Sequence, residues 1–120
     1  MAVDAEFLEH LLELFSGLGP LRKARMFSGF GIYADGDAMF AMLTGEGRVF
    51  MKTDAQSGVE YLAAGSEPFS YARGGKITQV HSFMSLPESA LDDPDEALRW
   101  ARLSLPAAQA AAVQKRRKAR

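Results

Sequence analysis

Residues 25–43 read RMFSGFGIYADGDAMFAML, a series of short apolar runs broken by glycine. The runs fall at 24–27, 30–33 and 38–43, and Asp35-Gly36 separates the second from the third. Short strands joined by tight turns are typical of an antiparallel meander. The third run is apolar on both alternating faces, so we expect an interior strand that is covered on each side.

An amphipathic helix is predicted before these strands. From about Asp4 to Leu18, apolar side chains recur at intervals of three and four residues, while glutamates fall on the other side. Asp4 can cap this helix, and the glycines and proline at 17–20 stop it.

A strand, a helix and a hairpin are predicted after the meander. In residues 48–52, Arg48, Phe50 and Lys52 alternate with the apolar Val49 and Met51, which indicates a half-exposed strand. Asp54 offers an N-cap, and Gly65 a left-handed C-terminal position, to a helix of roughly ten residues. Strands then flank a Gly74-Gly75 turn within 67–84.

The C-terminal part is predicted to be helical. Asp93 can cap a helix that has Pro94 in its first turn. Pro106 is expected to open a last, alanine-rich helix with few apolar anchors, which runs into an exposed and mobile basic tail. Residues 1–105 are therefore expected to form the domain, and residues 106–120 the alanine-rich helix and tail.

Together these elements predict one α+β domain with two layers, in which a mostly antiparallel sheet has helices packed chiefly on one side. The length of 120 residues suits a single core. The side chains expected to be largely buried are Phe7, Leu11, Phe15, Phe40 and Leu62.

The composition narrows the classes of function. The chain has no cysteine, which excludes disulfides, a thiol nucleophile and cysteine-based metal sites. Its first residues lack the basic and apolar regions of a signal peptide, and its longest apolar run is Ala38 to Leu43. We therefore expect a cytoplasmic protein with no membrane partner.

The net charge of −1 hides an asymmetry, since five of the 14 cations lie in the last six residues. Without those five, nine cations stand against 15 carboxylates, a balance of −6. Like charge repels phosphate. Nucleic-acid contact is therefore expected to be weak, non-specific and made chiefly by the tail cations Lys115, Arg116, Arg117, Lys118 and Arg120.

No catalytic constellation is recognisable. Gly29-Phe30-Gly31 lacks the third glycine of a dinucleotide loop, and a hairpin turn explains Asp35-Gly36-Asp37. Helix capping explains the carboxylates at 92–96. His81 has neither an orienting carboxylate nor an oxyanion hole in the sequence pattern. We therefore expect no catalytic residue, no cofactor and no metal, and we expect that the chain is not an enzyme.

Gly29 and Gly31 lie within an aromatic strand pattern, which indicates a bulge, a bend or close packing at these positions. One interpretation is a core strand whose glycines make room for rings of the first helix or of Trp100. The other follows strict alternation, which places Arg25, Phe27 and Tyr33 on one face. With Arg25 and Lys52 at its rim, this face would be a shallow aromatic and basic surface for a partner.

Several motifs resemble, in order and spacing, the N-terminal domain of the TfoX/Sxy regulators of bacterial competence. Phe27-Ser28-Gly29-Phe30-Gly31 stands where Phe-Gly-Gly-Tyr-Gly is usual, and Phe50-Met51-Lys52 where Tyr-Leu-Lys is usual. The other matching segments are 39–41, 64–71 and Leu86-Pro87, and the resemblance covers about residues 5 to 105.

The resemblance implies a two-layer α+β domain and, by association, a role in transcriptional activation alongside the cyclic-AMP receptor protein. It implies no catalytic residue or cofactor. Full-length TfoX proteins carry a second, helical domain, for which this sequence shows no counterpart.

Three hypotheses of function follow. The first is a non-enzymatic, TfoX-like regulatory module that contacts another protein, by resemblance a part of the transcription machinery or a regulator. The second is a weak nucleic-acid binder that uses the tail, with Arg22, Lys23 and Arg25 as further candidates. The third is a small-molecule-binding domain or enzyme with an aromatic pocket between sheet and helices, near Tyr33, Phe69, Tyr71 and Trp100.

Overall fold

The computed structural model describes residues 5–26 and 28–119. In chain order, the elements are α1 (Ala5–Leu14), the 3-10 turn η1 (Ser16–Leu18), β1 (Leu21–Met26), β2 (Gly29–Ala34), β3 (Ala38–Leu43), β4 (Val49–Lys52), α2 (Ala55–Ala63), β5 (Pro68–Arg73), β6 (Lys76–Ser85), the 3-10 turn η2 (Glu88–Asp92) and α3 (Pro94–Lys118). The strands form one antiparallel sheet in the order β1-β2-β3-β4-β6-β5.

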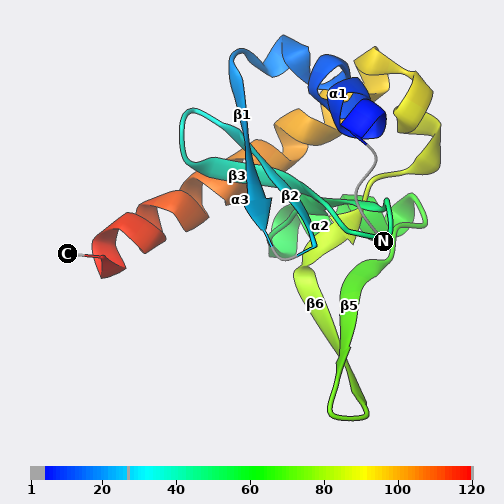
Figure 1. Cartoon of the computed structure of the whole chain (residues 1–120), viewed down its shortest axis with the longest axis vertical. Coiled ribbons are helices and arrows are strands. Elements are labelled where there is room, and N and C mark those ends of the chain that lie inside the picture. The colour runs from blue at the N-terminus through cyan, green and yellow to red at the C-terminus, as the bar shows by residue number, and fades with distance from the viewer. Residues whose placement is uncertain (1–4, 27, 120) are drawn as a thin grey trace.

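The helices lie on one side of this sheet. Helix α3 crosses β3 and β4, α1 packs against α3, and α2 lies beside β6, while the β5–β6 hairpin projects from the body (Figure 1). No helix covers the other face within the described ranges. This confirms the predicted α+β domain with a two-layer arrangement.

The core lies between the sheet and the helices. Leu11, Phe15 and Phe40 are fully buried, as predicted, and the rings of Phe15 and Phe40 meet edge to face with centroids 5.3 Å apart. Phe7 packs against this core but is only partly buried. The first helix thus contributes its inward stripe to the core as the spacing predicts.

The prediction for Leu62 is wrong. Its side chain is 60% exposed, and that of Val59 is 65% exposed. Tyr61 is the α2 residue that turns inward. Its ring packs on Trp100 with centroids 4.5 Å apart, and its hydroxyl donates to the Trp100 carbonyl oxygen at 3.0 Å. Helix α2 therefore buries one aromatic side chain and leaves its aliphatic residues at the surface.

Strand β3 is an interior strand, and a β-bulge explains part of its two-sided apolar pattern. Ile32 pairs with Ala41 and Tyr33 with Met39, so Phe40 is an extra residue on β3. Phe40 and Ala41 are both fully buried in the core. Two consecutive side chains thus pack toward the helices, although alternation assigns them to opposite faces.

One long helix replaces the two that the sequence predicts. Pro106 lies inside α3 and does not open a new helix. Proline removes one intrahelical hydrogen bond. Ala107, Ala108 and Ala112 are nevertheless buried, which anchors the C-terminal half of α3.

Polar contacts anchor the same half of α3 to the turn between β2 and β3. Gln109 donates to the Asp35 carboxylate at 2.7 Å, and Arg116 pairs with Asp37. The expectation that this segment has few anchors is therefore wrong: small alanines fit closely on the sheet where large side chains are not needed. None of the described helices combines the length and apolarity needed to cross a membrane.

Candidate functional site

The glycine-rich segment folds as a hairpin and not as one strand. Met26 pairs with Gly29 and Arg25 with Phe30, so the chain reverses between Met26 and Gly29. Residues paired in this way share a face of the sheet. Arg25 therefore lies with Phe30 on the helix side, whereas Tyr33 lies on the other side, and strict alternation from 25 to 33 fails because the reversal changes the phase.

We call the face of the sheet that carries no described helix the open face. Gly31 and Met42 pair on it, Met42 pairs in turn with Phe50, and Lys52 pairs with Phe83. Its further side chains are Met26, Arg22, Tyr33, Met39 and Arg48. Of the residues predicted as a partner surface, the structure thus brings Tyr33 and Lys52 to one face and puts Arg25 on the opposite one. Phe27 lies outside the described residues.

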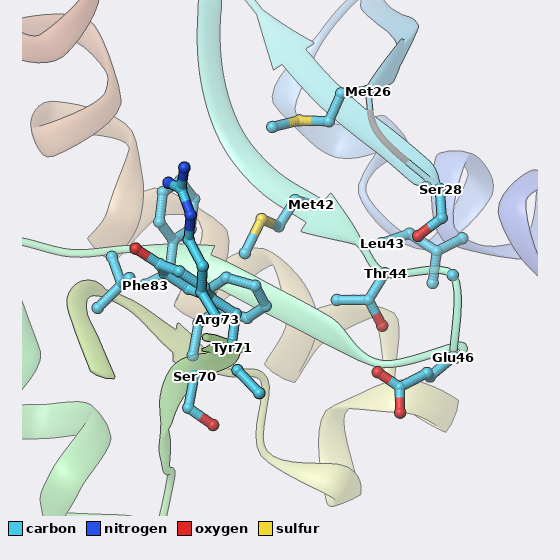
Figure 2. Close-up of a pocket in the computed structure, with 15 residues that line it drawn as sticks. Met26, Ser28, Met42, Leu43, Thr44, Glu46, Ser70, Tyr71, Arg73 and Phe83 are labelled. Carbon is cyan, nitrogen blue, oxygen red and sulfur yellow. The ribbon is translucent and has the colours of Figure 1, made fainter. Parts of the chain in front are cut away.

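A groove of about 790 Å³ lies on the open face. Met26 and Met42 line it from the body of the sheet, and Tyr71 and Arg73 line it from the β5–β6 hairpin (Figure 2). Phe69, Val80 and Phe83 add further apolar side chains to its lining, while Ser28, Thr44 and Glu46 lie at one end. Glu46 and Arg73 stand apart at opposite ends of the groove in Figure 2.

The β5–β6 hairpin forms one wall of the groove because it bends at a register shift. Pro68 pairs with Met84 but Phe69 pairs with Val80, which leaves residues 81–83 without partners on β5. The Phe69 ring then lies 5.1 Å from that of Phe50. Phe50 is consequently only 3% exposed, so the predicted half-exposed strand is buried on both faces at this position, while Lys52 on the same face is half-buried.

Three cations lie over aromatic rings of the open face. The guanidinium carbons of Arg22 and Arg48 are 4.2 and 5.0 Å from the ring centres of Tyr33 and Phe50, respectively. The ammonium of Lys52 is 4.9 Å from the centre of the Phe83 ring. A cation over the face of a ring is attracted by its quadrupole. These contacts fix positive charge at the surface around the groove.

The burial of Lys52 affects its charge. Partial burial lowers the pKa of its ammonium from the usual value of 10.5, because the charged form loses hydration. Among the described residues, no carboxylate forms an ion pair with Lys52 or Arg73. Arg48, in contrast, lies 3.7 Å from the Glu67 carboxylate.

Acidic residues gather in the helix layer. Glu6, Glu9 and Glu13 belong to α1, and the carboxylates at 92–96 surround the start of α3. The Asp93 carboxylate caps α3 by accepting from the backbone N–H groups of Asp95 and Glu96, as the sequence predicts. The excess negative charge of the chain therefore lies mainly behind the sheet, away from the open face.

The predicted nucleic-acid contacts lie elsewhere. Lys115, Arg116, Arg117 and Lys118 occupy the exposed last turns of α3, which project away from the body in Figure 1. One of them, Arg116, is engaged by Asp37. Arg120 lies outside the described residues.

The aromatic pocket predicted between sheet and helices is not formed by the four residues named for it. Trp100 packs on Tyr61 in the helix layer, whereas Phe69 and Tyr71 line the groove on the opposite side of the sheet. Tyr33 lies under Arg22, outside the groove lining. The glycines do not make room for Trp100 either, since a side chain at Gly31 would meet Met39, Tyr33 and Met26.

A smaller hollow lies beside α2. Val59 and Leu62, which are mostly exposed, line it together with the buried Met84. In the described part of the chain, no cluster of three or more His, Asp or Glu side chains is placed to hold a metal ion. His10 lies 2.8 Å from the Leu91 carbonyl oxygen, and His81 is exposed on β6.

Sequence reasoning missed most of the groove lining. Met26 and Met42 stand on neighbouring parts of the sheet, but the fold of the hairpin over them decides that they face a groove. The register shift at Pro68 that causes this fold leaves no periodic signal in the sequence.

A family model described as the TfoX N-terminal domain matches residues 13–108, which include every strand of the sheet, both sides of the groove and most of α3. A search of curated proteins finds no match. The match spans well over half of the 120 residues. The chain belongs to the TfoX N-terminal domain family.

Proposed function

We propose that this chain is a non-enzymatic regulatory module that contacts another protein through the groove on its open face. Family membership suggests a regulatory or competence-related role. The observation that carries the proposal is an apolar groove beside unpaired cations, on the face of the sheet that lacks helices.

The lining of the groove favours a protein partner. Methionines are flexible and polarizable, so they adapt to the side chains of different partners. Tyr71, on the hairpin wall, is 44% exposed, and tyrosine is enriched at protein interfaces because it combines an apolar ring with a polar hydroxyl. The described lining residues include no histidine, and Glu46 and Arg73 stand apart. These groups suit binding better than acid–base catalysis.

Site-specific photo-crosslinking tests the proposal. Benzoylphenylalanine would replace Tyr71 in the full chain, expressed in its host cells. Ile77 supplies the matched control, because it lies on the same hairpin, is 77% exposed, points to the opposite face of the hairpin from Tyr71 and does not line the groove. We expect an adduct with a defined protein from position 71 and not from position 77.

Other positions separate the possible failures. Val59 and Leu62 probe the hollow beside α2. An adduct from these positions alone would retain a protein-binding role and reject the groove as its site. Absence of a protein adduct from all four positions would contradict the proposed function.

A further inference from the structure

The geometry points to an acidic amphipathic segment of the partner protein as the occupant of the groove, with its apolar side chains against the methionines and its carboxylates facing Lys52 and Arg73. This inference rests on the proposed function and deepens it. It is carried by the pairing of an apolar lining with cations at one end of the groove.

Two cations adjoin the apolar lining at one end of the groove. Arg73 and Phe83 both line the groove, and Lys52 lies over the Phe83 ring. Neither cation has a carboxylate partner in the described residues. A ligand that covers Phe83 must therefore pass two unpaired positive charges, which favours carboxylates beside its apolar anchors.

The cations of the open face disfavour a second copy of this chain as the occupant. Stacking two open faces would place Arg22, Lys52 and Arg73 of both copies in one interface. Like charges placed opposite one another across an interface disfavour it. Most carboxylates lie in the helix layer, and among the described lining residues of the groove Glu46 is the one carboxylate, so such a dimer would leave most of these cations without an acidic partner.

Single-stranded nucleic acid is another polyanion that a basic sheet face could bind. Such binding relies on aromatic faces that are free to stack on bases. Here Arg22 covers Tyr33, Lys52 covers Phe83, and Phe50 is buried beneath the hairpin. These three rings are not free to stack, the exposed ring of Tyr71 alone is a small platform, and the Glu46 carboxylate at one end of the groove would repel phosphate. A peptide with apolar anchors fits these features better.

A helical segment can satisfy both requirements, because apolar residues at i, i+4 and i+7 form one stripe while acidic residues occupy the flanks. Glu46 lies at the end of the groove opposite Arg73, so one end of the groove is negatively charged and the other positively charged. The acidic end of the segment should therefore lie toward Arg73.

The experiment uses the full chain and a synthetic, fluorescent helix-forming peptide with leucine and phenylalanine at i, i+4 and i+7 and glutamate at the flanks. Three control probes accompany it: the same peptide with lysine in place of glutamate, a scrambled acidic peptide, and an oligothymidylate of equal charge. Fluorescence anisotropy measures each affinity. We expect the acidic amphipathic peptide to bind at least about tenfold more tightly than any of the controls.

Charge reversal makes the test specific to these cations. Arg73→Glu should weaken binding of the acidic peptide by about tenfold and improve binding of the lysine peptide. Ile77→Glu, on the other face of the same hairpin, should change neither. Lys52→Glu added to Arg73→Glu should strengthen the reversal. Because Arg73 is exposed, the single variant remains informative if the double variant fails to fold.

Several results would overturn the inference: equal binding of acidic and lysine peptides, no binding of the acidic peptide, no effect of Arg73→Glu, or preferential binding of the oligothymidylate. The photo-adduct at position 71 separates this failure from that of the proposed function. A protein adduct whose crosslinked segment is not acidic would reject the inference alone, whereas no protein adduct at any probed position would reject both.

Discussion

The ammonium of Lys52 lies 4.9 Å from the centre of the Phe83 ring, and these two residues pair across β4 and β6 on the open face. The contact holds a partly buried positive charge beside the groove without an acidic partner among the described residues. Such a charge destabilises the free protein, and a carboxylate of a bound partner would form an ion pair with it.

Lys52→Met should therefore stabilise the free protein at neutral pH. Burial lowers the pKa of Lys52, so the unfolded chain binds more protons than the folded chain between the folded pKa and 10.5. The contribution of Lys52 to stability thus rises with pH through that window. Urea unfolding at neutral and alkaline pH should show a higher midpoint for Lys52→Met at neutral pH and a smaller gain at high pH. A lower midpoint at neutral pH would contradict this account.

Tyr61 should lower the stability of the parent protein at alkaline pH, and Tyr61→Phe should remove this effect. Burial raises the pKa of Tyr61 above the usual value of 10.0, so the unfolded chain releases its proton first and stability falls as pH rises past that value. In the Tyr61→Phe variant, this contribution to the loss of unfolding free energy at alkaline pH should be absent. The variant should also lose about 1–2 kcal/mol at neutral pH, because the hydroxyl bonds to Ser104 Oγ and the Trp100 carbonyl are removed. An unchanged alkaline dependence in urea unfolding would refute the assignment.

The two glycines of the hairpin should differ in their tolerance of alanine. A Cβ at Gly29 would collide with the backbone carbonyl oxygen of Leu43, which cannot move without breaking β3, whereas a Cβ at Gly31 would lie 2.6 Å from the flexible Met39 sulfur. Gly29→Ala should cost more than about 3 kcal/mol, and Gly31→Ala less. The larger Gly31→Val change remains predicted to disrupt folding. Thermal melts of the three variants test this order, and equal midpoints for the two alanine variants would reject it.

Phe40→Ala should cost about 3–5 kcal/mol, since it empties the position between β3 and Phe15. Leu62→Ala is the matched control. Its side chain is mostly exposed, so the expected loss is below about 0.5 kcal/mol. A Phe40→Ala protein with the melting midpoint of the parent would show that the bulge does not place this ring in the core.

Truncation after Gln114 tests the role of the basic tail. We expect the intact chain to bind duplex DNA only weakly, without sequence preference, and with a slope of log affinity against log salt of about −4. The truncated chain should lose this binding. Binding that is tight at high salt, or that survives the truncation, would place a nucleic-acid site on the folded body.

The sequence predicted the elements whose signals are local. The Asp54 cap with Gly65 at the other end defines α2, and the Gly74-Gly75 turn, with both φ values positive, joins β5 and β6. The apolar stripe of the first helix likewise identified Leu11 and Phe15 as core residues, and both are buried. Caps, turns and periodicity are read from neighbouring residues, so no tertiary information was needed.

The errors arose where a tertiary contact overrides a local pattern. The chain reversal before Gly29 changed the phase of the strand and moved Arg25 to the helix side. Burial of alanines on the sheet carried α3 through Pro106. The groove itself depends on the hairpin bending at Pro68. Of the described residues of the predicted surface, Lys52 and Tyr33 reach the open face and Arg25 does not.

Methionine methyl resonances offer the most direct measurement of where the partner segment binds. Met26 and Met42 line the groove, Met51 lies in the core, and Met84 lines the hollow beside α2. The chain labelled at its methionine methyl groups would be titrated with the acidic amphipathic peptide. The account predicts that the resonances of Met26 and Met42 shift while those of Met51 and Met84 stay in place. Shifts confined to Met84, or no shift at Met26 and Met42 at saturating peptide, would contradict it.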